Sequence, residues 1–192
     1  MRGELGEFFH YLMQETSRLH LKWNEYEALF NAGPEKVTNM NLAAPGFFWL
    51  AQNALWHDII LNVCRITDNG TKVLSVKRLP GMTKIALRDE LNALLNRLEG
   101  AAAPAREARD RYIAHLEYEL LRDPTVQDAD MPERADVLNA IQAIDELLHF
   151  VDNHFAKSGP MLREHLDVMG GASSLHDIIR RGLRDRDERL TP

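Results

Sequence analysis

The chain has 192 residues, of which 45% are hydrophobic and 27% are charged, and this composition predicts a soluble globular protein. Its formal net charge of −6 argues against a protein that coats nucleic acid nonspecifically, because such binding depends on Lys and Arg side chains that neutralise phosphates. No apolar run reaches the roughly 18 residues of a membrane span, so we expect no membrane partner.

The length suits one well-buried domain. We therefore predict a single helical domain over residues 1–192, in which residues 157–192 form a less regular C-terminal extension. Cys64 is the only cysteine, which excludes an intrachain disulfide framework and fits a reducing compartment. The N-terminal residues lack the pattern of a signal peptide, so we expect a cytoplasmic protein.

Helical periodicity dominates the N-terminal part of the chain. The first predicted helix runs from about Leu5 to Phe30 and ends at the sequence NAGPE, where glycine and proline provide the stop. A polar loop is expected next. Pro45 then opens a second helix that ends near Gly70, and its apolar residues cover most of its circumference, which indicates a helix enclosed by others.

The rest of the chain continues this pattern. Residues 71–81 are expected to connect to a third helix over 82–100, and Pro104 suits the first turn of a fourth helix over 105–123. A fifth long helix is predicted over 134–155, and only a short helix around 174–183. The expected fold class is all-α: a bundle of four to five long helices with a short helical C-terminal tail.

The fourth helix, AREARDRYIAHLEYELLRD, carries two stripes at about 100° per residue. Its apolar stripe comprises Ala105, Ala108, Tyr112, Leu116 and Leu120. Its polar stripe comprises Arg111, His115, Tyr118 and Arg122, which can line a groove. Arg109 belongs to neither stripe and points toward the apolar side, where a guanidinium needs an acceptor to be tolerated.

The second helix offers acceptors for Arg109. A polar ridge crosses its otherwise apolar surface and is formed by Asp58, Asn62, Arg65 and Asp68. We expect this ridge to provide structural support, with Asp58 or Asp68 holding Arg109. From spacing alone, an interhelical ion pair without catalysis is the favoured interpretation.

The run RDRYIAH, from Arg109 to His115, resembles the signature of the HEPN superfamily: an arginine, a polar residue and, after a short interval, a histidine. It is most similar to the AbiU-type abortive-infection branch, because the helix end CRITDNG and the connector LSVKRL precede it. The resemblance covers residues from about Phe47 to Glu119. It implies an endoribonuclease of an abortive-infection or toxin type that uses no metal or other cofactor, with its site shared across a two-fold homodimer.

On this resemblance, His115 is the general acid or base in an attack by the ribose 2′-hydroxyl, and Arg109 binds the phosphate. Asp110 is expected to orient or tune this pair. The remaining polar stripe, Arg111, Tyr118 and Arg122, is then expected to contact RNA. A partner protein that neutralises the activity is a further expectation.

Three alternatives stay open. Arg111 can replace Arg109 as the phosphate ligand, because on an ideal helix it lies about 40° from His115, whereas Arg109 lies about 120° away. The chain can also be a non-catalytic HEPN module that binds RNA, a nucleotide or a partner protein. The third alternative is a metal-binding helical bundle, whose ligands would come from His10, His57, His115, His149, His154, Asp58 and Asp152.

Other features have plainer interpretations. Cys64 lies on the enclosed second helix, where an inert small hydrophobic residue is expected. Trp49 and Trp56 are seven residues apart and share a face, which predicts core or dimer-interface packing. The arginines between Arg180 and Arg189 are diluted by acidic residues, so we expect a solvated helical end there.

Overall fold

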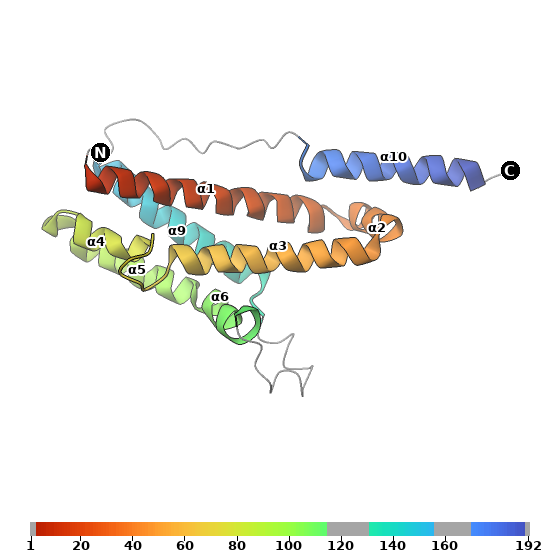
Figure 1. Ribbon diagram of the computed structural model, residues 1–192. Helices are drawn as coiled ribbons and strands as arrows, with labels where there is room; N and C mark the ends of the chain where they lie inside the picture. Colours follow the sequence, from red (N-terminus) through yellow and green to blue (C-terminus); the bar gives the residue numbers. More distant parts are fainter. Residues whose placement is uncertain (1–2, 115–130, 156–169, 191–192) are drawn as a thin grey trace. The chain divides into compact units, whose positions relative to one another are not determined.

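The computed structural model describes residues 3–114, 131–155 and 170–190, and these residues form helices and no strand (Figure 1). The helices are α1 (Glu4–Phe30), α2 (Pro34–Ala43), α3 (Pro45–Ile66), η1 (Val76–Arg78), α4 (Leu79–Met82), η2 (Ile85–Leu87), α5 (Arg88–Ala101), α6 (Ala103–Ala108), η3 (Arg109–Ile113), α9 (Arg134–Phe155) and α10 (Ala172–Leu190). The predicted all-α fold class is confirmed. Among the helices described, none combines the length and apolar composition that a bilayer span requires.

Two predicted segments were wrong in detail. The polar loop after the first helix is helix α2, which starts at Pro34 directly after Gly33, a glycine with a φ of 98°. Pro34 suits a first helical turn because its missing N–H would have no partner there. Helix α10 runs from Ala172 to Leu190 and is longer than the short helix predicted around 174–183.

The predicted fourth helix is not one continuous α-helix. Helix α6 ends at Ala108, and a π-helical turn, η3, spans Arg109–Ile113. The backbone N–H of Ala114 donates to the carbonyl of Arg109 at 2.8 Å, five residues back. The angular positions predicted at 100° per residue therefore do not apply beyond Ala108.

The chain divides into two compact units. The first comprises Met1–Leu19 and Ile59–Arg163, and the second comprises His20–Asp58 and Glu164–Pro192. The expectation of one domain with a less regular extension stays a prediction.

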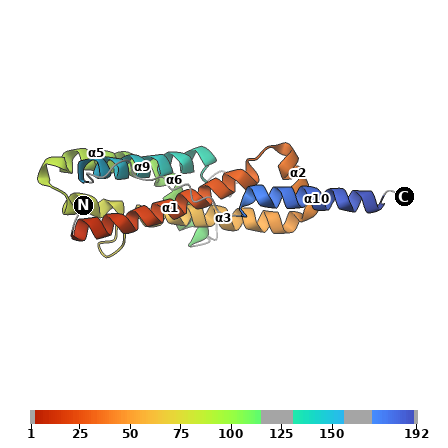
Figure 2. The ribbon, with the colours of Figure 1, turned by 90° about the horizontal axis from the view of Figure 1, so that it is seen from above.

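The core of the first unit lies along helices α5 and α9, which run side by side (Figure 2). Helix α9 places an apolar stripe in this core, formed by Val137, Ala140, Ile141, Ile144, Leu147, Leu148 and Val151. Helix α5 contributes Leu91, Leu94 and Leu98 at i, i+3 and i+7, the spacing of one buried helix face. The end of α3 adds buried residues around Val63 and Cys64.

The second unit has a smaller core in which Met40, Phe48 and Ile179 are buried together. An aromatic group beside it joins Trp23, Tyr26 and Trp56, with ring centroids 5.0 Å apart between Tyr26 and Trp56. The packing prediction therefore holds for Trp56, but the side chain of Trp49 is 67% exposed and is not part of this core.

Candidate active site

Arg109 begins the π-helical turn η3 and is held by its sequence neighbour. Its Nε donates to Oδ1 of Asp110 at 2.7 Å, and its Nη2 lies 2.7 Å from the same oxygen. The side chain of Arg109 is 28% exposed, whereas that of Asp110 is 58% exposed. The pair thus presents a carboxylate to solvent with a half-buried guanidinium behind it.

The charges around Arg109 favour its protonated form. Burial by itself lowers the pKa of Arg109, but the hydrogen bond to Asp110, the charge of the Cys64 thiolate at alkaline pH, and the charges of Asp110 and Asp68 outweigh it, so the pKa is raised. The guanidinium of Arg109 is therefore a cation at neutral pH.

Cys64, near the end of α3, lies close to two arginines. Burial raises the pKa of its thiol to about 11, and the charges of Arg109 and Arg106 oppose this rise. Both guanidinium groups therefore lie near Cys64. Because the thiol is neutral at physiological pH, it acts there as a small apolar side chain, as predicted.

Arg106 lies in this region and forms a basic patch of the sequence together with Arg109 and Arg111. Its Nε and Nη2 atoms are buried and have no hydrogen-bond partner in the part of the chain that the structure describes. Leaving such donors unpaired costs about 1–3 kcal/mol each. Its spacing from Arg109, at i and i+3, was the only indication in the sequence that the two arginines lie on neighbouring faces.

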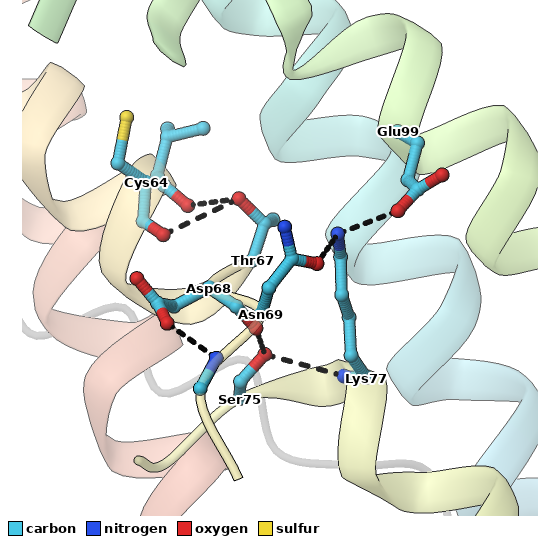
Figure 3. A network of polar contacts seen from close by, with 9 residues as sticks. Cys64, Thr67, Asp68, Asn69, Ser75, Lys77 and Glu99 are labelled. Atoms are coloured by element: carbon cyan, nitrogen blue, oxygen red, sulfur yellow. Dashed lines mark hydrogen bonds and ion pairs between the residues drawn. The ribbon is translucent and has the colours of Figure 1, made fainter. Parts of the chain in front are cut away.

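The loop after α3 is fixed by a polar network (Figure 3). The hydroxyl of Ser75 donates to the carbonyl of Asp68 at 2.7 Å, and Nζ of Lys77 donates to Asn69 and to Glu99 at 2.5 Å each. This network ties the end of α3 to α5. It sets the position of Asp68, whose carboxylate accepts from the N–H of Gly70 at 2.6 Å and contributes to the field at Arg109.

Arg111, the alternative phosphate ligand, is similarly accessible. Its side chain is 26% exposed, and Nη1 lies 3.5 Å from Oε1 of Glu107. Its guanidinium carbon lies 5.7 Å from the ring centre of Tyr112. Arg109 and Arg111 thus differ in what holds them: Arg109 has a close carboxylate at both Nε and Nη2, and Arg111 has a looser ion pair and an aromatic ring.

The four residues predicted to support the site differ in their burial and in the contacts they make. Asn62 is buried, Arg65 is exposed, and Asp68 acts on Arg109 only through its charge. Asp58 belongs to the second unit, where it lies 2.5 Å from Nζ of Lys22. The carboxylate in contact with Arg109 is that of the adjacent Asp110, and the expectation that Asp58 or Asp68 holds Arg109 stays a prediction.

The remaining predicted site residues, His115, Tyr118 and Arg122, lie outside the described residues. Within residues 3–114, 131–155 and 170–190, no group of three His, Cys, Asp or Glu side chains is arranged to hold a metal ion.

Comparison with known proteins supports the resemblance read from the sequence. A family model described as AbiU2, of the HEPN type, matches residues 2–173. No curated protein and no solved structure matched the chain. Because the match covers most of the chain and includes the Arg109 turn, the protein belongs to the AbiU2 family of HEPN proteins.

Proposed function

We propose that this chain is a metal-independent endoribonuclease of an abortive-infection or toxin type, acting in the cytoplasm as a homodimer. Membership of the AbiU2 family supports a HEPN-type module, and the Arg109 turn supplies the chemistry. The observation that carries the proposal is the half-buried guanidinium of Arg109, fixed by Asp110 at a π-helical turn. Such turns are frequent at functional sites because they displace side chains from regular helical positions.

The proposed reaction is an in-line displacement at phosphorus. His115 takes the proton from the ribose 2′-hydroxyl or gives one to the leaving 5′ oxygen. The bond from the 2′ oxygen to phosphorus forms as the bond to the 5′ oxygen breaks, leaving a 2′,3′-cyclic phosphate and a 5′-hydroxyl. Arg109 stabilises the negative charge that builds on the phosphate oxygens, while Asp110 keeps the guanidinium oriented.

Cleavage of labelled RNA in EDTA tests this proposal. We expect the wild-type protein to cut RNA, and His115→Ala and Arg109→Gln to lower the rate by about 100-fold or more with unchanged thermal unfolding. His149→Ala, a change at an exposed histidine of α9, is the matched control and should keep full activity. Equal cleavage by wild type and His115→Ala, or no cleavage by either protein, would refute the proposed ribonuclease activity.

The same assay decides between the two arginines. If Arg109 is the phosphate ligand, Arg111→Gln lowers the rate less than about tenfold, because the guanidinium that binds the reacting phosphate stays in place. The opposite order would assign the role to Arg111. Arg97→Gln, which removes an exposed ion pair with Glu146, controls for the loss of one positive charge.

Mixing two inactive variants tests whether the site is shared across a dimer. In a mixed dimer of Arg109→Gln and His115→Ala, an arginine from one copy and a histidine from the other remain intact. Activity should therefore return on mixing if the site combines residues of two copies. No recovery, despite subunit exchange, would place each site within one copy.

A second candidate is a non-catalytic HEPN module that binds RNA, a nucleotide or a partner protein. It is favoured by the contacts of Arg109, whose Nε and Nη2 are both already engaged by Asp110. Asp110→Asn separates the candidates, because it weakens the hold on Arg109 without removing the guanidinium. A lower cleavage rate supports an orienting role for Asp110, whereas tighter RNA binding without cleavage supports the module. A neutralising partner protein remains part of the proposal in either case.

A further inference from the structure

The loop after α3 contains the pair Asn69–Gly70, and Asn69 is the only asparagine of the chain that a glycine follows. Asn69 is exposed to water. In such a pair the backbone nitrogen of glycine can attack the side-chain amide carbon of asparagine, because the attack closes a five-membered ring within the chain. Glycine obstructs this approach least, since it has no Cβ. The contacts around the pair therefore determine how reactive the amide is.

The amide oxygen of Asn69 is bound by a cation. Its Oδ1 accepts from Nζ of Lys77 at 2.5 Å (Figure 3). The same ammonium donates to Glu99 at 2.5 Å, and the side chain of Lys77 is 15% exposed, so the cation is held in place. A cation at this oxygen stabilises the negative charge that builds there when a nucleophile attacks the amide carbon.

The backbone nitrogen of Gly70 is bound by a carboxylate. Its N–H donates to Oδ1 of Asp68 at 2.6 Å, where the carboxylate can take the proton as the nitrogen forms a new bond. A Cβ at position 70 would lie 2.9 Å from this oxygen and 3.2 Å from Cγ2 of Val73, so a side chain there would push the carboxylate away. Asp68 is itself fixed, because its carbonyl accepts from the hydroxyl of Ser75 at 2.7 Å.

We propose that Asn69 is a self-modification site, at which the nitrogen of Gly70 attacks the side-chain amide carbon. The bond from this nitrogen to Cγ of Asn69 forms while the N–H proton passes to Asp68. Negative charge builds on Oδ1, against Lys77. The bond from Cγ to Nδ2 then breaks, and Nδ2 leaves with the proton from Asp68 as ammonia. A cyclic imide remains, and water opens it to aspartate or isoaspartate at position 69.

The modification goes beyond the proposed function, because it needs only the chain itself and water. Either product places a second carboxylate beside Lys77, which already contacts Glu99. Isoaspartate also adds one methylene group to the backbone directly after Asp68, whose charge acts on Arg109. The reaction therefore changes the charge and the length of the loop that adjoins the candidate active site. RNA cleavage and modification are measured separately, so the failure of one leaves the other intact.

Incubation of the purified full chain at neutral pH, followed by tryptic digestion and mass spectrometry, tests the proposal. The tryptic peptide from Ile66 to Lys72 contains Asn69 as its only side-chain amide. We expect the folded chain to convert Asn69 about tenfold or more faster than the same chain in guanidinium chloride, where Asp68 and Lys77 are not held beside the pair. An equal or slower conversion in the folded chain would overturn the proposal, because the loop would then only protect the amide.

Two variants test the roles of the carboxylate and the ammonium. Asp68→Asn keeps an oxygen that accepts from the N–H of Gly70 but removes the base, and Lys77→Met removes the cation from the amide oxygen. Each should slow the conversion in the folded chain by about tenfold or more and leave the rate in guanidinium chloride unchanged. Lys84→Met, a change at an exposed lysine of the same unit, is the matched control and should convert at the wild-type rate.

A rescue separates chemistry from loss of structure. Lys77→Arg returns a cation to the amide oxygen and should recover most of the rate that Lys77→Met loses. Asn69→Gln gives the baseline, because its longer side chain does not close a five-membered ring. Wild-type conversion in folded Asp68→Asn or Lys77→Met, with unchanged thermal unfolding, would overturn the proposal.

Discussion

Titration of Cys64 measures the electrostatic environment that it shares with Arg106 and Arg109. The thiol is 1% exposed, and burial raises its pKa from the ordinary 9.0 to about 11 against the opposing charges of the two arginines. A difference of this size corresponds to about 3 kcal/mol of folding free energy. Because the pKa is raised in the folded state, this stability is complete below pH 9 and is lost as the pH rises toward 11.

Comparison of the wild type with Cys64→Ala isolates this contribution. Denaturant unfolding at a series of alkaline pH values should show the wild type losing about 2–3 kcal/mol more than the variant between pH 8.5 and 11.5. Lysine and tyrosine titrations occur in both proteins and cancel. In a second measurement, Arg109→Gln should shift an NMR titration of the Cβ of Cys64 to higher pH, because it removes a charge that lowers the thiol pKa. Identical pH dependence of stability in wild type and Cys64→Ala, or an unshifted Cys64 titration, would refute the reasoning.

Two further predictions concern the first unit. Hydrogen bonding to Lys77, followed by the charge of Lys77, lowers the pKa of Glu99 below its ordinary 4.5, so Lys77→Met should return it toward that value in a carboxyl NMR titration. The stability that this carboxylate contributes is present above pH 4.5 and is lost as the pH falls. In Lys77→Met this loss of stability on acidification should vanish. An unchanged Glu99 titration in Lys77→Met would contradict the assignment. Asn62 is 1% exposed and neither its Oδ1 nor its Nδ2 has a partner in the described part of the chain, so Asn62→Leu should raise the free energy of unfolding by about 1–3 kcal/mol in urea. Asn62→Ala, which leaves a cavity, is the control, and a destabilised Asn62→Leu would show that the amide has a role in the fold.

The helices that the sequence predicts best are those with a long apolar stripe. Helix α9 matches its predicted bounds, because its apolar residues keep the helical period over 22 residues. Helix α2 was missed because Met40 is its only buried residue, so the sequence carries almost no periodic pattern there. Its existence depends on Pro34 and on packing against α10, and a local pattern contains no information on that contact.

The contacts of Arg109 illustrate what a regular helical wheel leaves out. At 100° per residue, side chains at i and i+1 do not face each other, so residue spacing favours Asp58 and Asp68 on another helix as acceptors. In the structure the guanidinium folds back on Asp110, at the start of a turn whose hydrogen bonds run to the fifth residue. Neither the π-helical turn nor the pairing follows from residue spacing, because both depend on how α6 ends.

The same pairing connects the fold to the proposed chemistry. A phosphate that binds Arg109 must compete with Asp110 for Nε and Nη2, or use the nitrogen that Asp110 leaves open. This competition weakens the binding of the phosphate in the ground state and so lowers the affinity for the substrate. The rate of the chemical step is not lowered if the contact with Arg109 strengthens as negative charge builds on the phosphate oxygens. The carboxylate is 58% exposed and can move aside, whereas the guanidinium is anchored by its burial. Asp110 is therefore suited to hold Arg109 in position between reactions and to release part of it when a phosphate arrives.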